Sequence, residues 1–165
     1  MTVLQKPPAR LDEPEIKVEN LEEVAKELPP LLTRYWHERG DPDVVMDPDW
    51  QALLRQSAMG NVVLVTVRHD KAMVGFAFNL VHTHPSHRTV PHFTTLWFWL
   101  DPAYRVGAFG LKFARKNLSL LEEKAKAYGA PINRLFIAAP DERTATLYER
   151  AGYTFLEAVY VKVLK

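Results

Sequence analysis

A strand, a glycine-bearing loop, a long helix and a second strand follow one another in the second half of this sequence. Residues 92–100 are rich in the aromatic and β-branched side chains that strands favour. Residues 110–128 keep the apolar spacing of an amphipathic helix, and Gly129 and Pro131 follow where such a helix ends. Because residues 132–138 are again strand-like, the unit predicts two parallel strands joined by a helical crossover.

Side chains of the first of these strands alternate between two faces. Trp97 and Trp99 share one face, and the other face carries Leu96, Phe98 and Leu100. One of these faces is expected to pack in the core.

The segments around this unit complete one domain. Helices are expected over residues 20–39 (with a break at Pro29–Pro30), 48–57 and 141–150, and a hairpin over residues 62–68 and 72–81. A His-rich loop is expected over residues 82–91, and one bent strand or a strand pair over residues 153–164. The order predicts a single α+β domain over residues 20–165, with a mixed central β-sheet flanked by helices. Residues 1–19 precede it as an N-terminal arm, whose proline-bearing residues 1–18 form an extended segment or a short edge strand.

Composition narrows the classes of protein to which the chain can belong. The 165 residues are 47% hydrophobic and 25% charged, as in a globular protein, and the net charge of +1 gives no broad basic field, which disfavours nucleic acid as a partner. With no cysteine there is no disulfide and no thiolate nucleophile. The longest apolar stretches are strand-sized, and no apolar region follows the first residues, so we expect a cytoplasmic protein without a membrane span.

The loop between the strand and the long helix has the features of an anion site. Residues 104–110 read Y-R-V-G-A-F-G, and Lys112 and Arg115 add positive charge nearby. Glycines allow a tight turn, and the first N–H groups of the helix can bind a phosphate. A compact turn that binds nothing is the alternative. The G-K-[ST] of nucleotide hydrolases is absent, and the dinucleotide fingerprint lacks its first glycine.

Two stretches carry a resemblance to a known family. L-D-P-A-Y-R-V-G-A-F-G (residues 100–110) and D-E-R-T-A-T-L-Y-E-R-A-G-Y (residues 141–153) resemble motifs of the GCN5-related N-acetyltransferase (GNAT) superfamily, and V-G-F at residues 74–76 also fits. The resemblance covers residues 20–165 and implies the GNAT fold and acetyl-CoA as co-substrate. E-L-P-P-L-L-T-R-Y-W-H-E (residues 27–38) and M-D-P-D-W (residues 46–50) are similar to phage-encoded members, which implies the cytoplasm of a host cell.

The resemblance implies a cofactor-binding set in which strand backbone pairs with the pantetheine arm and the loop binds the pyrophosphate. Its members are Phe98, Trp99, Leu100, Arg105, Val106, Gly107, Ala108, Phe109, Gly110 and Lys112. Ala108 stands where the family pattern has its middle glycine, which reduces steric room for the phosphate. Asp141 and Thr144 replace the usual Asn and Ala of the later motif, and Asp is an equally good helix cap.

Tyr148 is the residue that the resemblance assigns as general acid. A phenol with a pKa near ~10 is protonated at neutral pH and can donate its proton to a departing thiolate. The alternative is an ordinary tyrosine on an amphipathic helix.

The base that would deprotonate the amine is left open by the sequence. Candidates are the histidines at positions 82, 84, 87 and 92, and Asp101 at the end of the strand; we name His92 and Asp101 as catalytic candidates. These histidines are equally consistent with solvated or structural roles. A metal site is disfavoured because the loop has no carboxylate nearby.

The leading hypothesis is an N-acetyltransferase that moves an acetyl group from acetyl-CoA to a primary amine by direct attack in a ternary complex. The acceptor is a small molecule or a protein, and the chain is a monomer or a homodimer. One alternative is a catalytically silent GNAT-fold binding protein, which Ala108 in the loop and the lack of an obvious base would favour. A second alternative is a nucleic-acid-modifying relative of the same fold.

Overall fold

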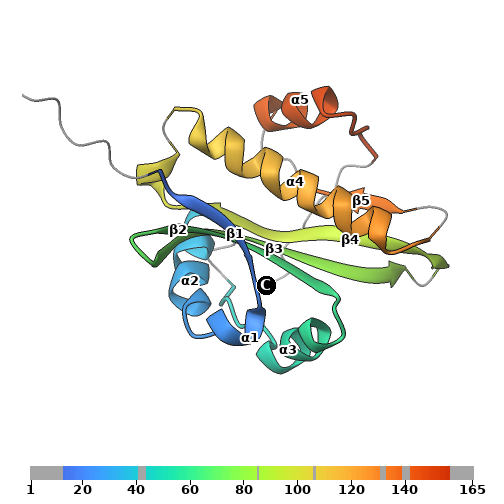
Figure 1. Cartoon of the computed structure of the whole chain (residues 1–165), viewed down its shortest axis with the longest axis horizontal. Coiled ribbons are helices and arrows are strands. Elements are labelled where there is room, and N and C mark those ends of the chain that lie inside the picture. Colours follow the sequence, from blue (N-terminus) through green and yellow to red (C-terminus); the bar gives the residue numbers. More distant parts are fainter. Residues whose placement is uncertain are drawn as a thin grey trace, which may run out of the picture.

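Five strands form one sheet in the order β1-β2-β3-β4-β5 in the computed structural model (Figure 1). The model describes residues 13–40, 44–84, 86–105, 107–130, 133–138 and 142–156. The strands are β1 (Glu15–Glu19), β2 (Val62–His69), β3 (Ala72–His84), β4 (His87–Leu100) and β5 (Arg134–Phe136). Neighbours are antiparallel except β4 and β5, which are parallel and joined by a helix, as the sequence predicts.

Helices cover both faces of the sheet (Figure 1). One face carries α1 (Leu21–Val24), α2 (Leu28–Arg39) and α3 (Trp50–Ala58); the other carries α4 (Phe109–Ala127), with α5 (Glu142–Arg150) beyond it. Each face has its own apolar core. Leu28, Phe76 and Trp99 belong to the core beneath α1–α3, and Phe93 and Phe113 to the core beneath α4. The predicted single α+β domain with a mixed sheet flanked by helices is therefore confirmed.

The predicted loop over residues 82–91 is wrong. β3 continues to His84 and β4 starts at His87, with His82 paired to His92 and Thr83 to Pro91. Cross-strand pairing satisfies the backbone whatever the side chains are, and the side chains of His82 and Thr83 lie exposed to solvent. The polar composition of residues 82–91 suggested a loop. The same residues can form a paired hairpin because the described polar side chains among them point to solvent.

Two helix starts also differ from expectation. α2 begins at Leu28 and carries both prolines in its first turn, where the missing N–H of proline costs nothing. α3 begins at Trp50, two residues later than expected, and its cap is Asp49, whose carboxylate accepts from Ala52 N at 2.9 Å. The expected strand over residues 153–164 is not seen at residues 153–156, and residues 157–165 lie outside the described chain. No helix in the described ranges has both the length and the apolar character that crossing a membrane requires.

β1 is the edge strand of the sheet and comes from the segment expected to be an arm or an edge strand. Its five residues pair with β2, and Arg68 of β2 links it to the N-cap of α2. The Arg68 guanidinium contacts Glu19 at 2.9 Å and Glu27 at 2.8 Å. The hydrogen bond from Arg68 is the main reason why the pKa of Glu27 is lowered, against a smaller opposing effect of burial.

Acid is expected to weaken this tie. Because the folded-state pKa of Glu27 lies below its ordinary value of 4.5, its stabilisation is present above pH 4.5 and is lost as the pH falls through the lowered folded-state pKa. Urea unfolding at pH 7 and pH 3 should show a smaller pH-dependent loss of stability for Arg68→Met than for the wild type. Arg55→Met on α3 is the matched control, and an identical loss in all three proteins would contradict the prediction.

Candidate active site

β4 and β5 separate after three paired positions. His92, Phe93 and Thr94 pair with Arg134, Leu135 and Phe136, and β4 then continues to Leu100. Within the described ranges, no strand pairs with this edge of β4 beyond Thr94. The edge therefore offers unpaired backbone N–H and C=O groups to an extended ligand.

A β-bulge lies at the start of the free edge. Trp97 pairs with Phe78 and Thr95 with Asn79, so Leu96 is an extra residue in β4. Bulges are common next to active sites because they redirect neighbouring groups. The sequence showed no sign of it, since the predicted alternation runs through Leu96 without a break.

The end of β4 leads into a tight loop and the start of α4. A 3-10 turn (Pro102–Tyr104) follows Asp101, and Gly107 has a φ of +67°, which side chains other than glycine's rarely adopt. Ala108 occupies the N-cap of α4 and provides no side-chain cap. The first N–H groups of α4 are therefore available to an anion. Val106 lies outside the described residues.

The side chains of the predicted pantetheine-binding residues are part of the core. Phe98 stacks on Phe113 at 4.7 Å, and Trp99 and Leu100 are 2% and 4% exposed. For Trp99 and Leu100 the backbone is therefore what remains to meet a ligand, which is the kind of contact that the resemblance implies.

Two of the cations expected at the loop, Arg105 and Lys112, contact carboxylates. Arg105 contacts Glu38 of α2 at 2.6 Å and donates from Nε to the carbonyl oxygen of Leu100 at 2.5 Å. Lys112 contacts Glu13 at 2.7 Å. An anion at this loop would therefore compete with Glu38 for Arg105. Sequence reasoning did not find Glu38, because nothing local links α2 to the end of β4.

Asp101 lies in the same cluster around Trp99. Its carboxylate accepts from Ala103 N at 3.0 Å and contacts Arg34 at 2.7 Å, and the Arg34 guanidinium lies 4.7 Å from the centre of the Trp99 ring. Burial by itself would raise the pKa of Asp101, but the hydrogen bonds from Ala103 and Arg34 lower it. Asp101 is thus a weak proton acceptor that caps a turn.

His92 lies at the other end of the free edge from Asp101, next to the rings of His82 and Phe136. Its ring centre lies 5.5 Å from that of His82 and 4.6 Å from that of Phe136, so the three rings cross β3, β4 and β5. His82 Nε2 is 3.0 Å from Thr94 Oγ1. His92 is 5% exposed, whereas His82 is exposed to solvent. The side chains of His84 and His87 lie outside the described part of the structure.

His92 and Asp101 cannot serve the same reacting carbon. They are nine positions apart along an extended segment, which corresponds to roughly 30 Å. His92 lies where β4 and β5 separate, and Asp101 lies beside the loop that leads into α4. Among the described side chains, no group of His, Asp or Glu has the arrangement of a metal site.

Tyr148 is carried by α5, on the same side of the sheet as α4 (Figure 1). Its ring lies 6.0 Å from that of Tyr153. Burial, with smaller effects of Glu122 and Tyr148, raises the pKa of Tyr153 to about 12, so Tyr153 stays neutral at any ordinary pH.

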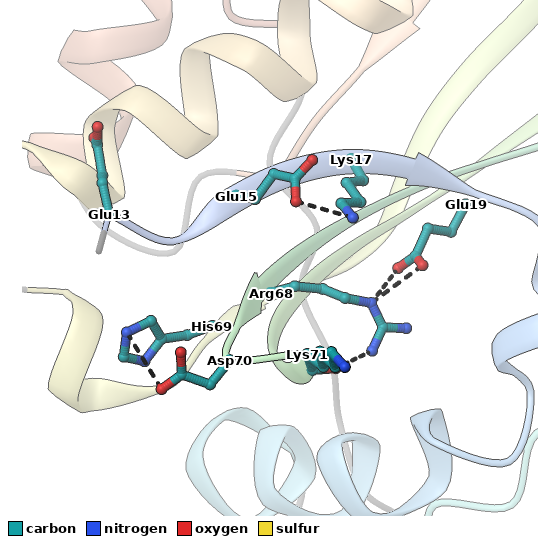
Figure 2. Close-up of a pocket in the computed structure, with 8 residues that line it drawn as sticks. All are labelled: Glu13, Glu15, Lys17, Glu19, Arg68, His69, Asp70 and Lys71. Carbon is teal, nitrogen blue, oxygen red and sulfur yellow. Dashed lines mark hydrogen bonds and ion pairs between the residues drawn. The ribbon is translucent and has the colours of Figure 1, made fainter. Parts of the chain in front are cut away.

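Two hollows lie outside the separation of β4 and β5. One, of about 360 Å³, borders His82 between α3 and β3. The other, of about 420 Å³, lies along β1 and the β2–β3 turn, and Figure 2 shows ion pairs among several of its charged groups. Lys17 contacts Glu15 at 2.9 Å there, and Arg68 contacts Glu19. This second hollow is a surface groove at the far edge of the sheet, where these positive charges are paired with carboxylates.

No protein-family model matches the sequence. No curated protein matches it. Solved structures of acetyltransferases do match. An aminoglycoside acetyltransferase from an uncultured soil metagenomic sample, solved with trehalose, is 15% identical, with a TM-score of 0.62 over 92% of this chain and 97% of that one.

Two further matches are also described as acetyltransferases. A ribosomal-protein-alanine N-acetyltransferase from Brucella melitensis is 18% identical, with a TM-score of 0.57 over 92% of this chain and all of that one. A predicted acetyltransferase from Clostridium acetobutylicum, solved with acetyl-CoA, is 13% identical, with a TM-score of 0.63 over 92% of this chain and 96% of that one. The chain therefore has the fold shared by these acetyltransferases, which is the fold that its motifs imply.

Proposed function

We propose that the protein is an N-acetyltransferase that moves an acetyl group from acetyl-CoA to a primary amine by direct attack in a ternary complex. The observation that carries the proposal is the separation of β4 from β5, with a free strand edge that leads to the uncapped start of α4. An extended amide-bearing arm suits the edge, and a diphosphate suits the helix start.

The residues of the loop and the strand edge divide the binding of acetyl-CoA between them. Backbone groups of Phe98, Trp99 and Leu100 pair with the pantetheine arm. The diphosphate is held by N–H groups of the loop and of the first turn of α4, together with the side chains of Arg105 and Lys112; the loop residues are Arg105, Val106, Gly107, Ala108, Phe109 and Gly110. The arm then runs back along β4 towards the bulge, which brings the thioester near His92.

Two proton transfers complete the reaction. His92, at the inner end of the free edge, accepts the proton of the amine, directly or through water, and the location disfavours Asp101 for this role. The neutral amine attacks the thioester carbonyl, the C–S bond breaks, and Tyr148 donates its proton to the departing thiolate. No covalent enzyme intermediate is required.

The acceptor class stays open between small amines and protein amines, since structures of similar fold act on both kinds. The motifs of residues 27–38 and 46–50 support a phage origin, and hence the cytoplasm of a host cell. Monomer and homodimer both fit the proposal.

Calorimetric titration with acetyl-CoA, and with desacetyl-CoA for comparison, tests the proposal first. Saturable micromolar binding is expected, followed by release of thiol when primary amines are screened. Absence of binding at high protein concentration would overturn it and would favour a silent binding protein. That alternative draws support from the pairing of Arg105 with Glu38 and of Lys112 with Glu13.

Arg105→Ala is expected to weaken the binding of acetyl-CoA by about tenfold or more, because a charge-assisted hydrogen bond to phosphate contributes ~1.5–3 kcal/mol. Calorimetry measures the change. Arg55→Ala, on the opposite face of the sheet, is the matched control and should bind as the wild type does. Equal affinities for all three proteins would remove Arg105 from the site.

A further inference from the structure

Three polar side chains are buried together between the sheet and α4. Asn79 of β3 and Asn117 of α4 are both 0% exposed, and Thr95 of β4 is partly buried. Asn79 Nδ2 donates to Asn117 Oδ1 and to the carbonyl oxygen of Val63, both at 2.9 Å, and Asn79 Oδ1 accepts from Thr95 Oγ1 at 2.7 Å. We call Asn79, Thr95 and Asn117 the asparagine network.

Such a network is costly in a core that is otherwise apolar. Burying polar groups loses their hydration, and replacing both partners of a buried hydrogen bond with apolar groups is often neutral for stability. A fully bonded network instead specifies one arrangement of the elements that it joins. The asparagine network joins β3, β4 and α4 at the residues that flank the bulge.

Thr95 reaches this network only because of the bulge. Trp97 packs against the core beneath α1–α3, and Phe98 against the core beneath α4. In a regular strand Thr95 would share the face of Trp97, since residues two apart lie on the same face. The extra residue, Leu96, moves Thr95 to the α4 face, where it bonds Asn79.

The bulge also decides which way His92 points. Phe93 belongs to the core beneath α4, so its neighbours His92 and Thr94 lie on the opposite face, where both meet His82. Without the extra residue, every side chain of β4 that precedes it would change face. His92 would then lie beneath α4.

We infer that Asn79 is a positioning residue: through Thr95 and Asn117 it holds the β4 bulge, and the bulge sets both the free edge of β4 and the face of His92. The inference rests on the proposed function for what that edge and that face bind. The structural half of the inference, that Asn79 holds the bulge and the bulge sets the face of His92, rests on the strand register and the hydrogen bonds of the asparagine network.

Thr95→Val tests the inference, because it removes the hydrogen bond to Asn79 and keeps the shape of the side chain. Thr95→Ser restores the hydroxyl. Thr66→Val is the matched control: Thr66 of β2 is also 0% exposed, and its hydroxyl donates to Glu19, away from the bulge. Asn79→Leu is a second and stronger variant.

Two measurements read the outcome. Nuclear Overhauser contacts of the His92 ring with His82 and Phe136 report the face of His92 in the ligand-free protein, well below the melting temperature. Calorimetry reports the affinity for acetyl-CoA. We expect Thr95→Val to weaken the His92 contacts and to raise the Kd for acetyl-CoA about tenfold, and Thr95→Ser to stay within about twofold of the wild type. Thr66→Val should alter neither quantity, although it lowers the melting temperature.

Each of three other results would overturn one part of the inference or the proposed function. Wild-type His92 contacts in both Thr95→Val and Asn79→Leu would show that Asn79 does not hold the bulge. Altered contacts with an unchanged Kd would show that the bulge does not set the cofactor edge. A wild-type protein that fails to bind acetyl-CoA would overturn the proposed function and the cofactor half of the inference, and the His92 contacts would still decide the structural half.

Discussion

Tyr148→Phe is expected to lower kcat at least ~100-fold and to leave the Kd for acetyl-CoA within about twofold. The change removes one oxygen and with it the proton that would go to the leaving thiolate, and a positioned general acid contributes 10²–10⁴-fold in rate. The ring itself is kept, so its packing on α5 near Tyr153 is preserved. Thiol release at saturating acetyl-CoA and calorimetric titration measure the two quantities.

Tyr153→Phe is the matched control for this experiment. Tyr153 is a neighbouring, half-buried tyrosine, and because burial raises its pKa to about 12 it is a poorer proton donor than an ordinary phenol. We expect its loss to change kcat by less than about threefold. Equal kcat values for Tyr148→Phe and the wild type would remove Tyr148 from the chemistry and would leave the acid unassigned.

Phe113→Ala is expected to lower the free energy of unfolding by about 3–5 kcal/mol, the usual cost of truncating a buried phenylalanine. Phe113 is 0% exposed on α4 and stacks on Phe98 of β4, with ring centres 4.7 Å apart and an interplanar angle of 23°. The contact holds α4 against the strand that bears the candidate cofactor edge. Urea unfolding monitored by circular dichroism gives the value.

Phe155→Ala serves as the comparison for the same measurement. Phe155 is 77% exposed, so its removal should change stability by less than about 0.5 kcal/mol. A loss below about 1 kcal/mol for Phe113→Ala would mean that α4 is not anchored through this ring.

Local patterns were enough to predict the crossover unit. The helical spacing of residues 110–128 and the terminating Gly129 predicted α4 within a residue at each end, and the faces of Trp97, Phe98 and Trp99 followed from strand alternation. These features depend on neighbours a few residues away, so the sequence displays them directly. The proposal that the loop binds an anion came from the same kind of signal, because Gly107 and the start of α4 are adjacent in the chain.

The tertiary structure decided where those patterns break and which charges meet. The bulge at Leu96 depends on Asn79 and Asn117, which are far from Leu96 in the sequence, and the pairing of His82 with His92 depends on the β3–β4 register. The contact of Arg105 with Glu38 spans 67 residues and sets what an anion must displace.

What the sequence by itself determined is therefore the order of helices and strands and the glycine and basic residues of the loop. Both depend on residues that are close together in the chain. Which face His92 occupies, and which partners hold Arg105 and Asp101, was decided only by the tertiary structure. Buried polar groups find their partners through packing of distant segments, and a single extra residue in a strand reverses every face before it.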